Sequence, residues 1–97
     1  MPNPKYANRN AILKYIFENQ DKYVDEEPLT ILKNIQIKLG FAKSTIHVIL
    51  ARMLDDEKLI LKEEKEHFTK QKNKIPVNRY YINPDKITVV REIISKM

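Results

Sequence analysis

The 97-residue sequence has no cysteine, a single glycine and only two histidines. Without cysteine it can form no disulfide, no thiolate zinc site and no cysteine nucleophile. The single glycine excludes a glycine-rich phosphate loop. No apolar run approaches roughly 18 residues, so we expect no membrane-spanning helix. The first ten residues lack the apolar core of a signal peptide, so we expect a cytoplasmic protein.

The sequence also lacks the usual groupings of catalytic and metal-binding residues. His47 and His67 fall on different expected elements, and their separation is not that of metal ligands. Ser44 and His47 are neighbours at helical spacing, but no oxyanion loop or orienting acid accompanies them. The carboxylates of residues 63–66 alternate with a lysine, as on a solvated strand. We therefore expect no enzymatic activity, no metal and no cofactor.

The charge is modestly positive, and its distribution says more than its sum. The net charge is +5 and the hydrophobic fraction of 42% is enough for one core, so we expect a single domain over residues 1–97. Residues 28–54 and 67–82 contain no acid and together carry +8, which leaves −3 for the rest of the chain. Two acid-free basic stretches favour a polyanionic partner such as nucleic acid.

Apolar spacing predicts three helices in the first half of the chain. The first spans residues 8–19 with Asn8 as its cap, and the second spans residues 30–39 with Thr30 as its cap. Gly40 ends the second helix because glycine adopts the left-handed conformation without steric cost. A third helix spans residues 43–56. On a helical wheel its inward side carries Ile46, Ile49, Leu50, Met53 and Leu54, and its outward side carries Ser44, His47, Val48, Ala51, Arg52 and Asp55.

The second half of the chain predicts a hairpin and a last helix. Residues 59–68 and 75–82 are rich in strand-forming residues at their outer ends. Between them lies the polar, basic segment TKQKNK, which lacks the sequence of a tight turn and predicts a long loop. Asn83 and Pro84 then open a helix over residues 84–97, with Asn83 as the cap.

In this order of elements, the stretches LTILKNIQIKLGFAKSTIHVILARMLDDEKLI and NRYYIN resemble the winged helix-turn-helix family of transcriptional regulators. The resemblance covers residues 29–83. It implies a mainly α fold with a small β-hairpin: a helix-turn-helix over residues 30–56, a wing over 59–82 and a C-terminal helix over 84–97. Two positions depart from the family pattern. Ala42 replaces a common capping serine or proline, and Lys58 replaces a common glycine before the wing.

The resemblance also implies a function, sequence-specific binding of double-stranded DNA to regulate transcription. The third helix would enter the major groove, and the basic wing would lie on the backbone or in the minor groove. Val48 would contact thymine methyl groups, and the polar and basic residues would contact phosphates or base edges. The expected DNA contacts are Lys43, Ser44, Thr45, His47, Val48 and Arg52 on the helix and Lys70, Gln71, Lys72, Asn73, Lys74 and Arg79 on the wing.

The last helix carries an apolar stripe that predicts a homodimer. Terminal helices commonly pair two subunits in this family, and a two-fold dimer would read a palindromic site. Alternatively, the stripe packs on the core of its own chain. The expected interface residues are Ile87, Val90, Ile94 and Met97.

Two other partners remain open at this point. The same fold can serve as a protein-interaction module without sequence-specific DNA binding, through the exposed apolar residues of the third helix. RNA binding would have to involve the wing or single strands, because the RNA major groove does not admit a helix. The sequence specifies no small-molecule effector, no operator and no direction of regulation.

Overall fold

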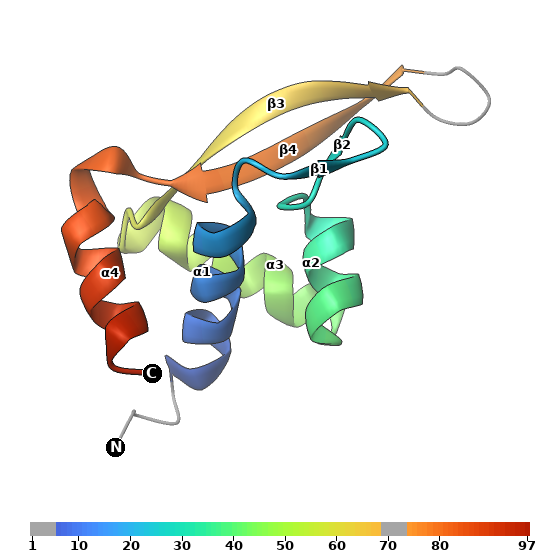
Figure 1. The fold of residues 1–97 in the computed structure, drawn as a ribbon. Helices are drawn as coiled ribbons and strands as arrows, with labels where there is room; N and C mark the ends of the chain where they lie inside the picture. The colour runs from blue at the N-terminus through green and yellow to red at the C-terminus, as the bar shows by residue number, and fades with distance from the viewer. Residues whose placement is uncertain (1–5, 69–73) are drawn as a thin grey trace.

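The computed structural model describes residues 6–68 and 74–97 and is mainly helical, with a small antiparallel hairpin (Figure 1). This confirms the expected mixture of elements. In chain order, the helices are α1 (Ala7–Asn19), α2 (Leu32–Leu39), α3 (Lys43–Ala51), the π-helix η2 (Arg52–Asp56), the 3₁₀ helix η3 (Pro84–Lys86) and α4 (Ile87–Ser95). The strands are β1 (Tyr23–Val24), β2 (Glu27–Pro28), β3 (Ile60–Phe68) and β4 (Lys74–Ile82).

Helix α1 is the centre of the fold. It contacts α2, α3, α4 and β4, and its buried residues Ile12, Leu13 and Ile16 form the middle of the core. The β3–β4 hairpin crosses over the helices at one end, as Figure 1 shows. The other helices except η3, the residue before β3 and both long strands add apolar side chains to this core, namely Ile35, Ile46, Leu50, Met53, Leu59, Ile60, Tyr80, Ile82 and Val90.

The turn between α2 and α3 forms as the sequence predicts. Gly40 ends α2 with a φ of 73°, and its N–H donates to the Gln36 carbonyl at 2.8 Å. The predicted sidedness of the third helix is also confirmed. Ile46, Leu50 and Met53 are buried, whereas every residue assigned to the outward side is exposed. The turn and the buried stripe together fix which face of α3 meets solvent.

The end of this helix differs from a regular α-helix. From Arg52 the chain continues as η2, in which the Glu57 N–H donates to the Arg52 carbonyl at 2.9 Å. Lys58 then takes a left-handed φ of 56° and directs the chain into β3. This is the position where the resembling family commonly has glycine. Lysine here therefore adopts a conformation that glycine adopts at lower cost.

In the hairpin, β3 and β4 pair from Ile60 opposite Ile82 to Phe68 opposite Lys74. Because side chains alternate along a strand, Tyr80 and Ile82 face the core, and Arg79 and Tyr81 face the other side. Of the two adjacent tyrosines, Tyr80 is therefore the one that is buried.

Two local expectations about helix caps were wrong. Helix α1 begins at Ala7, so Asn8 lies within the helix and does not cap it. Helix α2 begins at Leu32, and Thr30 is buried with an unpaired Oγ1 instead of capping the helix. The backbone explains this, since the Thr30 carbonyl accepts the Tyr80 N–H at 3.2 Å and holds Thr30 against β4. By contrast, Asn83 does cap η3, accepting the Asp85 N–H at 3.0 Å.

The β1–β2 ribbon was not predicted from the sequence. Its turn is made by Asp25 and Glu26, which both have positive φ values, of 51° and 66°. Glycine adopts this conformation more readily than acidic residues do, so the residue types at this position do not predict a turn.

Candidate functional site

The outward face of α3 is the first part of the candidate site. Ser44, His47 and Arg52 are exposed, and no hydrogen bond or ion pair holds their side chains within residues 6–68 and 74–97. Val48 lies among them with 52% of its surface exposed. Thr45 is half-buried and is less accessible than its neighbours. The face thus combines free polar groups with the exposed aliphatic side chains of Val48 and Ala51.

The N-terminus of α3 adds unpaired backbone donors to this face. Ala42 occupies the N-cap position, and no side chain caps the helix. The first intrahelical bond runs from the Ile46 N–H to the Ala42 carbonyl at 3.1 Å, so the preceding amides have no partner in the helix. The first turn carries no acid and begins with the exposed Lys43. A helix end of this kind favours negative charge.

A groove of about 400 Å³ lies between the start of α3 and the β3–β4 hairpin. Its polar lining includes Lys33, Lys43, His47 and Asn78. Glu27 is its one acidic lining residue, and its carboxylate accepts from Asn34 Nδ2 at 2.8 Å and lies 3.5 Å from Lys33 Nζ. The complete lining is Glu27, Ile31, Leu32, Lys33, Lys43, His47, Val77, Asn78 and Tyr80.

The electrostatics of the groove are mixed along the hairpin. Glu64 is exposed and pairs directly with Asn78, so its carboxylate lies on the same face of the hairpin as the groove. Glu63 points to the opposite face, where Arg79 and Lys65 neutralise it. Because Glu27 offsets Lys33, the positive character of the groove comes from Lys43 on α3, and Glu64 reduces it on the strand side.

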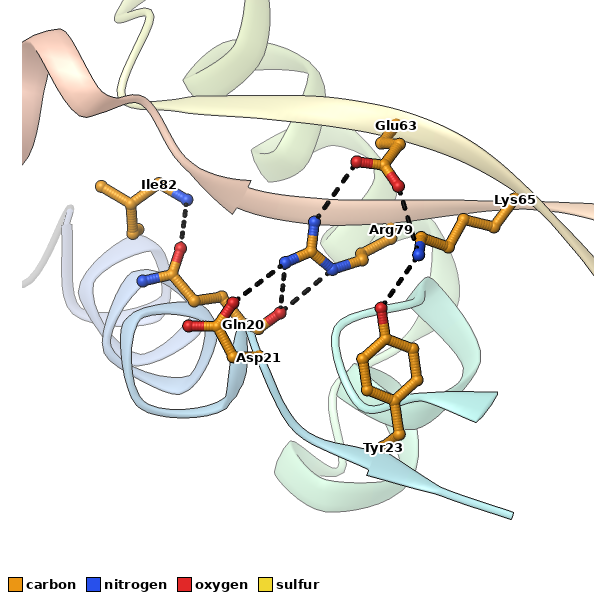
Figure 2. Close-up of polar contacts among 7 residues, drawn as sticks. All are labelled: Gln20, Asp21, Tyr23, Glu63, Lys65, Arg79 and Ile82. Carbon is orange, nitrogen blue, oxygen red and sulfur yellow. Dashed lines mark hydrogen bonds and ion pairs between the residues drawn. The ribbon is translucent and has the colours of Figure 1, made fainter. Parts of the chain in front are cut away.

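The expected DNA contact at Arg79 was wrong. The Arg79 side chain is only 12% exposed, and its Nε and Nη2 donate to the Gln20 carbonyl at 3.0 and 2.5 Å. The same guanidinium lies 3.4 Å from Asp21 and 3.6 Å from Glu63 (Figure 2). Arg79 thus uses its donors within the protein, because strand alternation turns it toward the end of α1 and away from the groove.

This contact belongs to a polar clasp, formed by Gln20, Asp21, Tyr23, Glu63, Lys65 and Arg79, that fixes the hairpin to the preceding elements. The Gln20 side chain accepts the Ile82 N–H at 3.0 Å, and Lys65 Nζ donates to the Tyr23 hydroxyl at 3.0 Å (Figure 2). The hydrogen bond to Tyr23, and then that to Glu63, raises the pKa of Lys65. The clasp positions β3 and β4 relative to α1.

Four expected contacts at the hairpin tip, Lys70, Gln71, Lys72 and Asn73, lie outside the described residues. Lys74 is described only in its backbone, which opens β4 opposite Phe68. The prediction for these five residues stays a prediction.

The α4 stripe divides between the core and the surface. Val90 is fully buried in the core of its own chain, so its assignment to a subunit interface was wrong. The reason is the packing of α4 on α1, which seats Val90 beside the α1 apolar residues. Ile87 and Ile94 are partly buried against the same core, and Met97 is 51% exposed. Val89, which the sequence reasoning did not single out, is 45% exposed.

Comparison of the chain with protein-family models, with curated proteins and with solved structures found no match. The geometry of the described residues must therefore carry the functional argument. In that part of the chain, no helix is long and apolar enough to cross a membrane. No group of three or more histidines or carboxylates there is placed to hold a metal ion.

Sequence reasoning missed three residues of this region. Lys33 and Asn78 line the groove, yet they come from elements that only the fold brings beside α3. Ile37 on α2 is 71% exposed, the largest value among the exposed apolar residues of the described chain. Its position outside the α2 apolar stripe was a usable signal, since an isoleucine on the outward side of a short helix must meet solvent.

Proposed function

We propose that this protein binds double-stranded DNA as a winged helix-turn-helix regulator, with α3 in the major groove. The observation that carries the proposal is the exposed, unpaired outward face of α3, which has no acid within residues 43–51 and lies beside the groove. Lys43 and Arg52 supply unpaired cations about two and a half turns apart, and the uncapped amides of α3 add donors for a phosphate.

In this arrangement phosphate contacts position the helix and other residues read the bases. Lys43 and Arg52 act mainly on phosphates. Ser44 and His47 have free hydrogen-bonding atoms for base edges, and Val48 supplies an aliphatic contact for a thymine methyl group. The β3–β4 hairpin lies over the adjacent DNA backbone, and the polar clasp holds the hairpin in place relative to α1.

The test measures fluorescence anisotropy of a labelled random-sequence duplex over a series of salt concentrations. The double variant Lys43→Gln, Arg52→Gln should bind all sequences more weakly. Its log–log salt slope should fall by about 2 per protomer, because each lost phosphate contact removes roughly 0.9 from the slope. The double variant Lys14→Gln, Arg91→Gln removes the same charge from exposed positions on α1 and α4 and serves as the matched control.

Equal losses in the two double variants would mean that only net charge matters and that α3 is not the contact surface. Ser44→Ala and His47→Ala, tested by selection from a random duplex pool, should change the preferred sequence more than the overall affinity. An unchanged preference in both variants would contradict base reading by α3.

We also propose that two protomers associate through α4, around the exposed Val89 and Met97 and the partly buried Ile87 and Ile94. A two-fold pair would present two α3 helices to successive major grooves, roughly 34 Å apart. Sedimentation equilibrium should give a dimer at tens of micromolar, and Val89→Glu should give a monomer. A monomeric wild-type protein would refute this part of the proposal.

A second function is favoured by one observation, the exposure of Ile37 and Val48 on the two helices that flank Gly40. Two exposed aliphatic residues suit docking on another protein as well as they suit DNA. Duplex binding that is absent even at low salt would favour this protein-interaction module over the DNA-binding regulator.

A further inference from the structure

A second hollow lies on a different side of α3, between η2 and the start of α1. It measures about 220 Å³ and is formed by residues from two segments that are distant in sequence, residues 6–9 and 49–57. Its lining is Tyr6, Arg9, Ile49, Arg52, Asp56 and Glu57.

One wall of this pocket is already neutralised. The Arg9 guanidinium forms an ion pair with Glu57, donates twice to Asn10 Oδ1 at 3.0 and 2.8 Å, and stacks over the Tyr6 ring at 4.4 Å. The Arg9 and Glu57 side chains are only 17% and 30% exposed. These contacts use the polar atoms of the pair, so the pair forms a fixed wall and offers little charge to a ligand.

The other charged lining residues have no such partners. Arg52 and Asp56 are both exposed, and neither makes a hydrogen bond or ion pair within the described part of the chain. They lie four residues apart, which places their side chains on the same side of the helix. A free guanidinium and a free carboxylate therefore face one hollow, beside the aliphatic Ile49.

The backbone at this place is unusual as well. Arg52 and Asp56 are the first and last residues of the π-helix η2, and the left-handed Lys58 follows two residues later. Single π-helical turns are rare and are frequently found at functional sites. The π-helical geometry sets the relative direction of the two unpaired charges.

We propose that this pocket binds a small zwitterion, specifically an aliphatic α-amino acid. The ligand carboxylate pairs with the planar guanidinium of Arg52, whose geometry suits a carboxylate, and the ligand ammonium pairs with Asp56. Both ligand groups are attached to one carbon atom, which matches two protein charges on one side of a helix. The aliphatic side chain lies against Ile49. Two cations balance two carboxylates in the lining, so the pocket disfavours nucleotides and other polyanions.

The pocket also has a consequence for DNA binding, and this part rests on the proposed function. Arg52 belongs both to the pocket lining and to the outward face of α3. A carboxylate bound to Arg52 withdraws one cation from the DNA backbone. The ligand should therefore weaken duplex binding and reduce the salt slope by about 1 per protomer.

The test is isothermal titration calorimetry of the full chain, without DNA, with L-valine, L-valinamide and N-acetyl-L-valine as probes. The amide lacks the carboxylate and the acetyl derivative lacks the ammonium. We expect L-valine to bind with a Kd on the order of 1 mM or tighter, and both derivatives to bind at least about tenfold more weakly. An absence of binding by L-valine, or equal binding of all three probes, overturns the proposal.

Single substitutions then test which charged residue of the pocket binds which group of the ligand. Arg52→Gln should abolish the preference for valine over valinamide, and Asp56→Asn should abolish the preference for valine over N-acetylvaline. Asp55→Asn, an exposed neighbour that does not line the pocket, and Arg91→Gln on α4 should leave all three affinities unchanged. Equal losses in Asp55→Asn and Asp56→Asn would overturn the assignment. Because the titration contains no DNA, it can succeed whether or not the duplex experiment does.

Discussion

Replacing Gly40 with alanine tests the reason for the only glycine in the sequence. Gly40 ends α2 with a φ of 73°. A Cβ built there meets no heavy atom within 4 Å, so an added methyl group has open space around it. The cost of Gly40→Ala therefore comes only from the backbone conformation and not from a steric clash.

The magnitude follows from two opposing effects. A left-handed conformation costs a non-glycine residue about 1–2 kcal/mol. Alanine also restricts the unfolded chain, which returns roughly 0.4–1 kcal/mol to the folded state. The net loss should be about 1 kcal/mol, which for a domain of this size corresponds to a fall in Tm of roughly 4–8 °C.

Urea unfolding followed by circular dichroism measures this loss, and the slope against urea should stay unchanged because the surface exposed on unfolding is the same. Gly40→Asn is the matched variant, and it should lose less than Gly40→Ala because asparagine tolerates the left-handed region better. A variant as stable as the wild type would refute the conformational argument. A loss above about 3 kcal/mol would show that the methyl group does meet a neighbour.

Four further predictions follow from the packing and charges. Lys58→Gly should raise the free energy of unfolding by about 0.5–1 kcal/mol, since φ is 56° there, whereas Lys14→Gly in α1 should lower it by a similar amount. Leu50→Ala should cost about 2–5 kcal/mol, measured by the same urea unfolding, because Leu50 is in the core. Glu64→Gln should tighten duplex binding in the anisotropy assay, because it removes a carboxylate beside the groove. Burial raises the pKa of Tyr80 above 10.0, so the protonated Tyr80 makes its full contribution to the free energy of unfolding below about pH 10. This contribution is lost as the pH rises further. In Tyr80→Phe, urea unfolding should show a smaller loss of stability at alkaline pH.

The elements with strong periodic patterns were predictable from the sequence. The inward and outward sides of α3 could be assigned because Ile46, Leu50 and Met53 recur at helical spacing, and burial of such a stripe leaves one arrangement. The cap at Asn83 was also predictable, because a proline follows it directly and fixes the first helical position.

The failures concern residues whose environment comes from distant segments. Thr30 has the chemistry of a helix cap, but its backbone pairs with Tyr80, fifty residues away, and this contact moves the start of α2. Arg79 has the chemistry of a phosphate contact, but the Gln20 carbonyl at the end of α1 takes its donors. The local sequence shows which contacts a side chain can make, whereas the fold decides whether that side chain is free to make them.

The same distinction separates the candidate contacts on α3 from the basic residues elsewhere. A positive side chain can serve a polyanion only if no internal acceptor already holds it, and by this criterion Lys43 and Arg52 qualify whereas Arg9 and Arg79 do not. Arg52 also borders the pocket that contains the free Asp56. The one cation shared by both surfaces is therefore where ligand binding and DNA binding would compete. For this reason Arg52→Gln should affect both assays, and Lys43→Gln should affect only the duplex.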